Sequence, residues 1–239
     1  MAVAWRYSVV IPAFNEADSL ARVVAAVAGL PGPVEVIVVD DGSTDGTAEE
    51  IARVERDLPI VSLRLPVNRG KGAAVRAGIA RASAPVVVLH DADLEYDPAS
   101  LLALVTPIER GIADAVYGSR FMGAVGQATG PVHRCANWLL TWLSNRFTCL
   151  RLTDMETGQK AFRRDLIQRL ELVEERFGIE PEITAKLART GCRMLEVPVR
   201  YSGRSRAAGK KIGIRDGLWA MVCIVRHSTG VWPPSGPAR

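Results

Sequence analysis

Carboxylate side chains follow two apolar stretches of the chain at the point where each stretch ends. In VVVLHDADLE, Asp91, Asp93 and Glu95 come after a run of valines, and in VEVIVVDD the pair Asp40 and Asp41 closes a similar run. If both runs form neighbouring parallel strands, the carboxylates converge where open α/β sheets bind ligands. These are hard oxygen ligands that suit Mg²⁺ or Mn²⁺ bridging a diphosphate. The spacing predicts a nucleotide–metal site, with a solvated turn as the competing interpretation.

The segment NRGKGAAVRAG offers a further place for an anion. It opens a predicted helix, so the backbone N–H groups of the first turn and the ammonium group of Lys71 could meet a phosphate. The segment lacks the GxxxxGK[ST] pattern, and no GxGxxG follows the first predicted strand, so neither a P-loop nor a Rossmann dinucleotide site is expected. A glycine-rich helix start with a solvated cation is the alternative.

Strand and helix signals alternate along the part of the chain that must position these residues. Near-continuous apolar runs are typical of parallel strands buried on both faces, and they occur in YSVVIPAF, VEVIVVDD, IVSLRL, PVVVLHD and DAVYGS, with a later candidate in MLEVPVRY. Helices are predicted in STDGTAEEIARVERD, DPASLLALVTPIERG, CANWLLTWLSNRFTCL, RDLIQRLELVEE and EPEITAKLARTG. Asp97 and Pro98 match an N-cap and a first helical position, which separates Asp97 from the acids before it. The expected class is α/β, with a mostly parallel central sheet flanked by helices.

The segment after the predicted strand DAVYGS changes in character. Residues 118–134 are rich in glycine and predict a long loop. The following helix places large apolar side chains on one face, namely Trp138, Leu139, Trp142, Leu143, Phe147 and Leu150. Such a stripe suits a helix at a membrane surface, and it suits a core or dimer face equally well.

The overall composition is that of an ordinary globular protein, since 48% of the 239 residues are hydrophobic and 23% are charged. The formal net charge is +4, and the cations gather in one late loop without an aromatic, basic groove, so nucleic-acid binding is not expected. No window reaches the about 18 to 20 apolar residues of a membrane span, so any membrane contact should be peripheral. The four cysteines contain no CxxC pair and are expected to be reduced, buried and inert.

The order of short motifs along the chain resembles that of family-2 glycosyltransferases. VVIPAFNE, VIVVDDGSTDGT, NRGKGAAVRAG, DADLEYDP, YGSRF, TGQKAFRR and EPEITAKLAR occur in the family's order and span roughly Tyr7 to Arg226. The subgroup resembles dolichyl- and other polyprenyl-phosphate mannosyl- or glucosyltransferases. The resemblance implies a GT-A-type, Rossmann-like fold with C-terminal acceptor-side or interface helices. It implies one catalytic domain over 1–228, with a nucleotide-sugar half (about 1–120) and an acceptor half (about 121–228), followed by a flexible tail at 229–239.

The resemblance also implies a nucleotide-sugar site. Its members by motif position are Pro12, Ala13, Phe14, Glu16, Asp40, Asp41, Lys71, Asp91 and Asp93. The implied metal ligands are Asp91, Asp93 and Glu95, with Mg²⁺ or Mn²⁺ as the cofactor. Two positions depart from the common pattern. Glu95 stands where Gln is frequent in mannosyltransferases, which leaves metal coordination and sugar preference open, and Phe14 stands where Tyr is common.

The implied acceptor site is cationic. Phosphate-binding roles carry over to Arg120 of YGSR, to Arg134 at the start of the tryptophan-rich helix and to Arg204 of the late loop, for which Arg206 is an equal candidate. Asp154 in TDMETG is the implied acceptor-side carboxylate, so that Asp93, Arg120 and Asp154 are the implied catalytic residues.

The nature of the acceptor decides whether a base is needed. A phosphate monoester is largely ionised near neutral pH and could attack the anomeric carbon directly. A hydroxyl acceptor needs a carboxylate base, for which Asp154, Glu180 and Glu182 are available, although the last two could equally be acids that cap a helix.

The sequence thus predicts an inverting, metal-dependent hexosyltransferase. Its expected donor is a nucleotide-diphosphate sugar of the GDP-mannose or UDP-glucose type, and its expected acceptor is a dolichyl- or undecaprenyl-like phosphate. Such an enzyme would work at the cytoplasmic face of a membrane through peripheral contact. The alternatives are a family-2 enzyme acting on a soluble or glycan hydroxyl acceptor and a non-catalytic nucleotide-sugar-binding module. The sequence predicts no oligomeric state.

Overall fold

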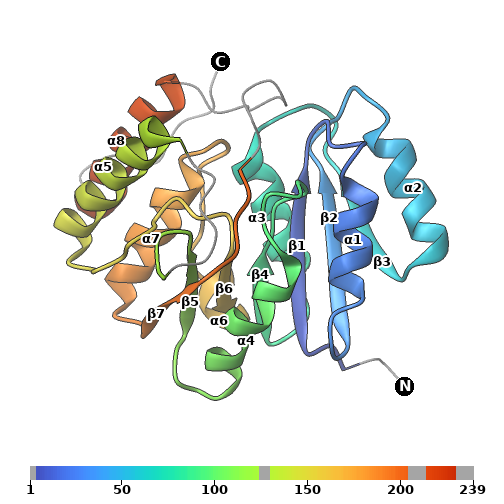
Figure 1. The fold of residues 1–239 in the computed structure, drawn as a ribbon, viewed down its shortest axis with the longest axis horizontal. Helices are drawn as coiled ribbons and strands as arrows, with labels where there is room; N and C mark the ends of the chain where they lie inside the picture. The colour runs from blue at the N-terminus through green and yellow to red at the C-terminus, as the bar shows by residue number, and fades with distance from the viewer. Residues whose placement is uncertain (1–3, 124–129, 204–213, 230–239) are drawn as a thin grey trace.

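The computed structural model describes residues 4–123, 130–203 and 214–229, which fold around one seven-stranded sheet (Figure 1). Its strands run in the order β3-β2-β1-β4-β6-β5-β7. They are β1 (Tyr7–Ala13), β2 (Val34–Asp40), β3 (Ile60–Arg64), β4 (Val86–Leu89), β5 (Ala115–Ser119), β6 (Lys160–Arg163) and β7 (Met194–Pro198). All pairs are parallel except those that β6 makes with β4 and β5. The predicted mostly parallel sheet is therefore confirmed, whereas β6 lies in a segment for which no strand was predicted.

Helices follow most of the parallel strands. They are α1 (Leu20–Ala28), α2 (Thr47–Asp57), α3 (Lys71–Arg81), α4 (Leu101–Glu109), α5 (Pro131–Thr148), α6 (Arg164–Gln168), α7 (Ile179–Thr190) and α8 (Ile214–Thr229). A single 3₁₀ turn, η1 (Pro98–Ser100), precedes α4, and its cap confirms the prediction for Asp97, whose carboxylate accepts a hydrogen bond from the backbone N–H of Ala99 at 2.9 Å. The longer helix predicted from RDLIQRLELVEE is wrong, because α6 ends after five residues.

Different helices cover the two faces of the sheet. Side chains of one strand alternate between the faces, so Val9 and Ile11 of β1 pack on one side and Val10 packs on the other. Helices α1, α2 and α4 cover the first side, and α3, α6 and α7 cover the second. Every residue of β2 is buried, as expected for a parallel strand enclosed on both faces. The unbroken apolar runs of the sequence follow from this double coverage.

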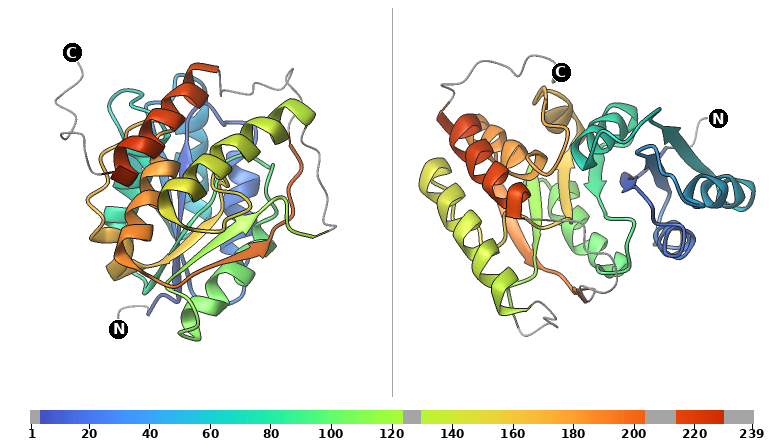
Figure 2. Two further views of the ribbon diagram at one scale, coloured as in Figure 1. Left: turned by 90° about the vertical axis from the view of Figure 1, so that its left-hand side faces the viewer. Right: turned by 90° about the horizontal axis from the view of Figure 1, so that it is seen from above.

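Helices α5 and α8 lie side by side against α7 (Figures 1 and 2). The predicted apolar stripe of α5 divides, because Leu143 and Leu150 pack against the core while the other members are exposed. Together the two helices expose Val132, Trp138, Leu139, Trp142, Phe147, Leu218, Trp219, Val222 and Val225. Within the described residues, no helix combines the length and the apolar character needed to cross a membrane.

The prediction that the cysteines are buried is wrong for two of them. Cys135 and Cys149 are exposed, Cys192 is partly exposed and Cys223 is buried. The two exposed thiols belong to α5 or to its C-cap, where the helix presents its outer side to solvent instead of the core.

Candidate active site

The carboxyl ends of β1, β2 and β4 meet at one edge of the sheet because these strands are adjacent and parallel. A cavity of about 390 Å³ opens there. Ten of the predicted site residues line it, namely Pro12, Ala13, Phe14, Glu16, Asp41, Lys71, Asp91, Asp93, Glu95 and Arg120. The topology thus brings together residues that are more than one hundred positions apart in the chain.

The neighbouring acids at the end of β2 have different surroundings. Asp40 does not line the cavity, and its buried carboxylate accepts a hydrogen bond from the backbone N–H of Ser43 at 2.9 Å. Asp41 faces the cavity and accepts hydrogen bonds from the backbone N–H groups of Arg69 and Gly70 at 2.8 and 2.7 Å. These bonds fix the loop that leads into α3, whose first residue is Lys71.

Lys71 lies between two carboxylates of the site. Its Nζ is 2.8 Å from Oδ1 of Asp91 and 3.1 Å from Oε1 of Glu180. The other oxygen of Glu180 contacts Nζ of Lys160, which is fully buried. Burial lowers the pKa of Lys71, but the charges of Asp91 and Glu180 outweigh it and raise this pKa above its ordinary value. Burial likewise raises the pKa of Asp91, and Lys71 more than reverses that effect. The lysine and the aspartate therefore face the cavity as a charged pair.

The predicted metal ligands share the cavity without forming a closed metal cage. Among the described residues, the group of three possible metal ligands whose ligand atoms lie within 4.8 Å of one another is Glu174, Cys223 and His227, which are not the predicted ligands. Glu95 accepts a hydrogen bond from the hydroxyl group of Tyr201, and its backbone N–H donates to Oδ1 of Asp93 at 3.1 Å. Mg²⁺ and Mn²⁺ commonly bind through one or two carboxylates together with substrate phosphates. Asp91 and Asp93, two hard oxygen donors on one cavity wall, fit that mode of binding.

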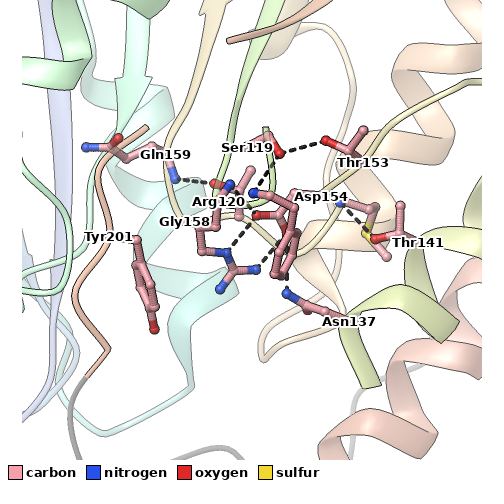
Figure 3. Close-up of polar contacts among 12 residues, drawn as sticks. Ser119, Arg120, Asn137, Thr141, Thr153, Asp154, Gly158, Gln159 and Tyr201 are labelled. Carbon is pink, nitrogen blue, oxygen red and sulfur yellow. Dashed lines mark hydrogen bonds and ion pairs between the residues drawn. The ribbon is translucent and has the colours of Figure 1, made fainter. Parts of the chain in front are cut away.

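Arg120, at the end of β5, is held by a buried carboxylate (Figure 3). Its Nε and Nη2 donate to the two oxygens of Asp154, each at 2.7 Å, and its backbone N–H donates to Oδ2 at 3.0 Å. Asp154 is fully buried. The guanidinium group also lies over the ring of Tyr201, 5.3 Å from the ring centroid. A bidentate pair of this kind fixes the orientation of the cation that lines the cavity.

Of the two other predicted acceptor cations, only Arg134 lies within the described residues. Arg134 is an exposed residue in the first turn of α5 and does not line the cavity. Arg204 and its equal candidate Arg206 lie outside the described residues.

Sequence reasoning missed several residues that line the cavity. They are Asn68, Gly70, Ala74, Ala92, Tyr96, Glu156, Gly158, Arg176, Phe177 and Tyr201. Glu156 is the most informative of them, because burial, aided by the negative charge of Glu180, raises its pKa to about 7. In the sequence, Glu156 could have been identified from its position in TDMETG, two residues after the predicted catalytic residue Asp154.

His90 precedes the acidic turn and is fully buried. Its Nδ1 lies 3.0 Å from the side-chain nitrogen of Gln159. Burial lowers the pKa of His90 to about 4, so the imidazole is neutral near neutral pH. It supports the wall behind the cavity and does not line the cavity itself.

The segment that carries Arg176 and Phe177 is tied to α8. Glu174 accepts hydrogen bonds from Trp219 at 3.2 Å and from Arg226 at 3.3 Å, and it lies 3.0 Å from Nε2 of His227. Burial raises the pKa of Glu174, but these partners together bring it below its ordinary value. Glu174 thus joins the segment that precedes Arg176 and Phe177 to α8.

Glu182, in the first turn of α7, does not cap that helix with its side chain but binds the segment that precedes it. Its carboxylate accepts hydrogen bonds from the backbone N–H groups of Val173 and Glu174 and lies 2.7 Å from Nζ of Lys186. Glu182 does not line the cavity.

A larger hollow of about 660 Å³ lies away from these residues, beside the beginnings of β4 and β5. Its charged lining is paired internally, for example Arg193 with Asp114 at 3.0 Å and Arg6 with Glu109 at 2.5 Å. It contains none of the predicted site residues, so the smaller cavity is the candidate active site.

Comparison with known proteins shows to which family the chain belongs. The model of the family described as "Glycosyl transferase family 2" matches residues 8–171, more than half of the chain. This chain belongs to glycosyltransferase family 2. The matched region extends from the second residue of β1 to beyond β6 and includes the acids Asp91, Asp93 and Asp154.

Two named relatives of this family-2 glycosyltransferase are bacterial. It is 31% identical over 211 residues to "Dodecaprenyl-phosphate galacturonate synthase" of Rhizobium johnstonii, covering 85% of this chain and 61% of that protein. It is 32% identical over 212 residues to "Undecaprenyl-phosphate 4-deoxy-4-formamido-L-arabinose transferase" of Pseudomonas fluorescens, covering 85% and 59%. The chain therefore spans about three fifths of the length of these relatives. A glycosyltransferase of Mycobacterium bovis, 33% identical over 206 residues, is covered to 89% of its length.

Solved structures share the fold of the family-2 glycosyltransferase. Glucosyl-3-phosphoglycerate synthase from Mycobacterium tuberculosis in complex with phosphoglyceric acid superposes with a TM-score of 0.71 at 23% identity, over 94% of this chain and 80% of that chain. The same enzyme with Mn²⁺, UDP-glucose and phosphoglyceric acid gives 0.69 at 22% identity, over the same shares of the two chains. These likenesses establish the Rossmann-like GT-A architecture that the motifs predicted.

Proposed function

We propose that this glycosyltransferase transfers a hexose, with inversion at the anomeric carbon, from a nucleotide-diphosphate sugar to a polyprenyl phosphate. One observation carries the proposal. Arg120, oriented by the buried Asp154, lines the same cavity as the acidic pair Asp91 and Asp93. A cavity with carboxylates on one wall and a fixed guanidinium on another suits two phosphorylated substrates, one bound with a divalent cation and one bound directly.

The donor side of the proposal rests on the acidic pair and Lys71. Asp91 and Asp93 would hold Mg²⁺ or Mn²⁺, and the cation would stabilise the charge that develops on the leaving diphosphate. Lys71, held 2.8 Å from Asp91, adds a positive charge beside the same position. The M. tuberculosis enzyme that shares the fold has been crystallised with Mn²⁺ and UDP-glucose, which supports a divalent cation and a nucleotide sugar here.

The acceptor side rests on Arg120 and on the state of the nearby carboxylates. Both oxygens of Asp154 bind Arg120, Glu180 is paired with two lysines, and Glu182 binds backbone N–H groups. These three carboxylates, the predicted candidates for a base, are therefore poor bases for a hydroxyl acceptor, whereas a phosphate monoester needs no base. Two relatives are named for dodecaprenyl and undecaprenyl phosphates, which supports a lipid phosphate.

A lipid acceptor needs an apolar surface close to the cationic site. The exposed tryptophans Trp138 and Trp142 of α5 and Trp219 of α8, with their aliphatic neighbours, offer one, and tryptophan is favoured at membrane interfaces. Asn137, on the same helix as Trp138, reaches within 3.5 Å of the Asp154 carboxylate. We place this face against the cytoplasmic surface of the membrane, in peripheral contact.

The direct test is a transfer assay that separates lipid-linked product from water-soluble product. The protein is incubated with Mn²⁺ or Mg²⁺ and radiolabelled GDP- and UDP-sugars, with and without polyprenyl phosphate. The expected result is label entering the organic phase only when metal and lipid phosphate are both present. Label that stays aqueous in a glycan, or donor hydrolysis alone, would overturn the proposal. Turnover that persists with a chelator would overturn its metal requirement.

A further inference from the structure

Glu156 differs from every other acid of the acceptor side. It lines the cavity, and one of its carboxyl oxygens, Oε1, is buried and has no hydrogen-bond partner among the described residues. Asp154 and Glu180, the nearest acids in this part of the site, are both held by cations. A buried polar oxygen without a partner is unfavourable, because it has lost its hydrogen bonds to water without replacement. A group bound in the cavity would remove that cost.

The position of Glu156 in its segment indicates which bound group would lie beside its unpartnered oxygen. Two residues before it, Asp154 holds Arg120, the proposed site of the acceptor phosphate. Two residues after it, Gly158 packs so closely on Asp91 that an added Cβ would lie 2.1 Å from the carboxylate oxygen Oδ2. The segment therefore runs from the acceptor cation to the donor carboxylate. In a transfer reaction, the group that lies between the leaving diphosphate and the attacking phosphate is the sugar ring.

The chemical state of Glu156 suits a hydroxyl partner. Burial, with the like charge of Glu180 adding to it, raises the pKa of Glu156 to about 7. A substantial share of the carboxyl groups is then protonated near neutral pH, and a protonated carboxyl group both donates and accepts hydrogen bonds. A sugar hydroxyl has the same dual capacity.

We propose that Glu156 is a specificity-determining residue that hydrogen-bonds a hydroxyl group of the transferred hexose. This inference rests on the proposed function, because it takes the cavity as the site of a nucleotide sugar. It assigns recognition of the sugar to the segment before β6, and it does not assign Glu156 the role of a base. The glutamine variant distinguishes the two roles, since a side-chain amide donates and accepts hydrogen bonds but does not take up a proton.

The test compares the affinity for complete donors and for donors that lack one hydroxyl. Wild-type protein, Glu156→Ala and Glu156→Gln are titrated calorimetrically with UDP-glucose, GDP-mannose and their monodeoxy analogues in the presence of Mn²⁺. UDP and GDP serve as the matched controls because they lack the sugar. We expect wild type to lose about tenfold in affinity on one particular deoxy analogue, as for one hydrogen bond to a buried partner. Glu156→Ala should bind that analogue and its parent sugar equally, and Glu156→Gln should restore most of the difference.

Three outcomes would overturn the inference. In the first, Glu156→Ala binds the complete donor as tightly as wild type does. In the second, it loses the same affinity for the free nucleotide as for the donor. In the third, the alanine and glutamine variants both abolish turnover while all donor affinities stay unchanged, which is the signature of a base. Donor binding without any transfer of label to polyprenyl phosphate would refute the proposed acceptor alone and would leave the affinity comparison standing.

Discussion

The guanidinium group of Arg120 and the carboxylate of Asp154 form a two-point ion pair, with both N–O distances at 2.7 Å and with Asp154 fully buried. Replacing Asp154 by Asn removes the charge and leaves the arginine without its fixed orientation. Because breaking a buried pair typically costs about 3 to 5 kcal/mol, we expect Asp154→Asn to lower the free energy of unfolding by about that amount. We also expect transfer to fall at least a hundredfold. Chemical denaturation and the organic-phase assay measure the two effects.

The control for this prediction is a charge pair at the surface. Arg163 and Asp165 are both about half exposed and lie 2.8 Å apart. Asp165→Asn should leave transfer unchanged, because exposed pairs contribute little and this one lies outside the cavity. Full activity of Asp154→Asn would contradict the role assigned to the buried pair.

A second prediction separates two aspartates of one short stretch. Asp93 lines the cavity, whereas Asp97 caps the 3₁₀ turn before α4. Asp93→Asn should abolish metal-dependent donor binding and transfer without unfolding the protein. Asp97→Asn should keep transfer and lose at most about 1 kcal/mol of stability, as expected for an altered cap. Calorimetric titration with donor and Mn²⁺ measures the first effect, and thermal unfolding measures the second. Equal losses of activity in the two variants would refute the assignment of Asp93 to the site and of Asp97 to the cap.

A third prediction concerns the close approach of Gly158 to the acidic pair. An alanine at this position would place its Cβ 2.1 Å from Oδ2 of Asp91 and 3.1 Å from the ring of Tyr96, so the carboxylate must move. We expect Gly158→Ala to weaken metal-dependent donor binding at least tenfold and to lower stability by about 1 to 3 kcal/mol, as overpacking usually does. The matched variant is Gly217→Ala in α8, where a Cβ meets nothing within 4 Å. It should stabilise the helix by about 0.5 to 1 kcal/mol. Unchanged donor affinity in Gly158→Ala would show that this packing does not position Asp91.

A fourth prediction follows from the raised pKa of Glu156. The folded protein holds this proton up to about pH 7, whereas the ordinary glutamate pKa is 4.5. Between these two values the folded state binds more protons than the unfolded state, so stability falls as pH rises through the window. Above about pH 7 the cost is complete, and it amounts to at most about 3 kcal/mol. Glu156→Gln removes the ionisable group and should therefore be more stable than wild type at pH 8 but equally stable at pH 4. Denaturant unfolding at the two pH values measures this difference, and equal stability at pH 8 would show that the carboxyl group ionises normally.

A fifth prediction tests the apolar face of α5. Trp138 and Trp142 are stacked, with ring centroids 6.5 Å apart, and are 64% and 52% exposed. Changing both to Glu should reduce sedimentation with anionic phospholipid vesicles at least tenfold, while transfer to a short, water-soluble polyprenyl phosphate is retained. Ile112→Glu, at an equally exposed position in the turn after α4, should leave vesicle binding unchanged. If the double variant binds the vesicles as well as wild type does, this face does not contact the membrane.

Much of the donor half was predictable from the sequence because its signals are local. A strand buried on both faces requires an unbroken apolar run, and the end of the run marks where a side chain reaches the ligand edge of the sheet. Asp41, Asp91 and Asp93 all line the cavity for that reason. The cap at Asp97 was equally readable, since an N-cap depends on contacts within a few residues.

The distinction between Asp40 and Asp41 required the tertiary structure. The sequence shows two adjacent acids, and only the path of the loop after β2 turns one away from the cavity and the other toward it. The antiparallel strand β6 could not be predicted from the sequence either. Its four residues show no strand pattern of their own, and they form a strand because they pair with β4 and β5.

By itself, the sequence determined the family, the α/β class and the acidic turn that faces a donor. The tertiary structure decided which charges meet: that Asp154 is committed to Arg120, that Glu180 bridges two lysines, and that Glu156 alone among these three acids keeps a buried oxygen without a partner in the described chain. The physical reason is that the pKa and the pairing of a charged group depend on neighbours that the fold brings from distant segments. Such neighbours leave no trace in the spacing of residues along the chain.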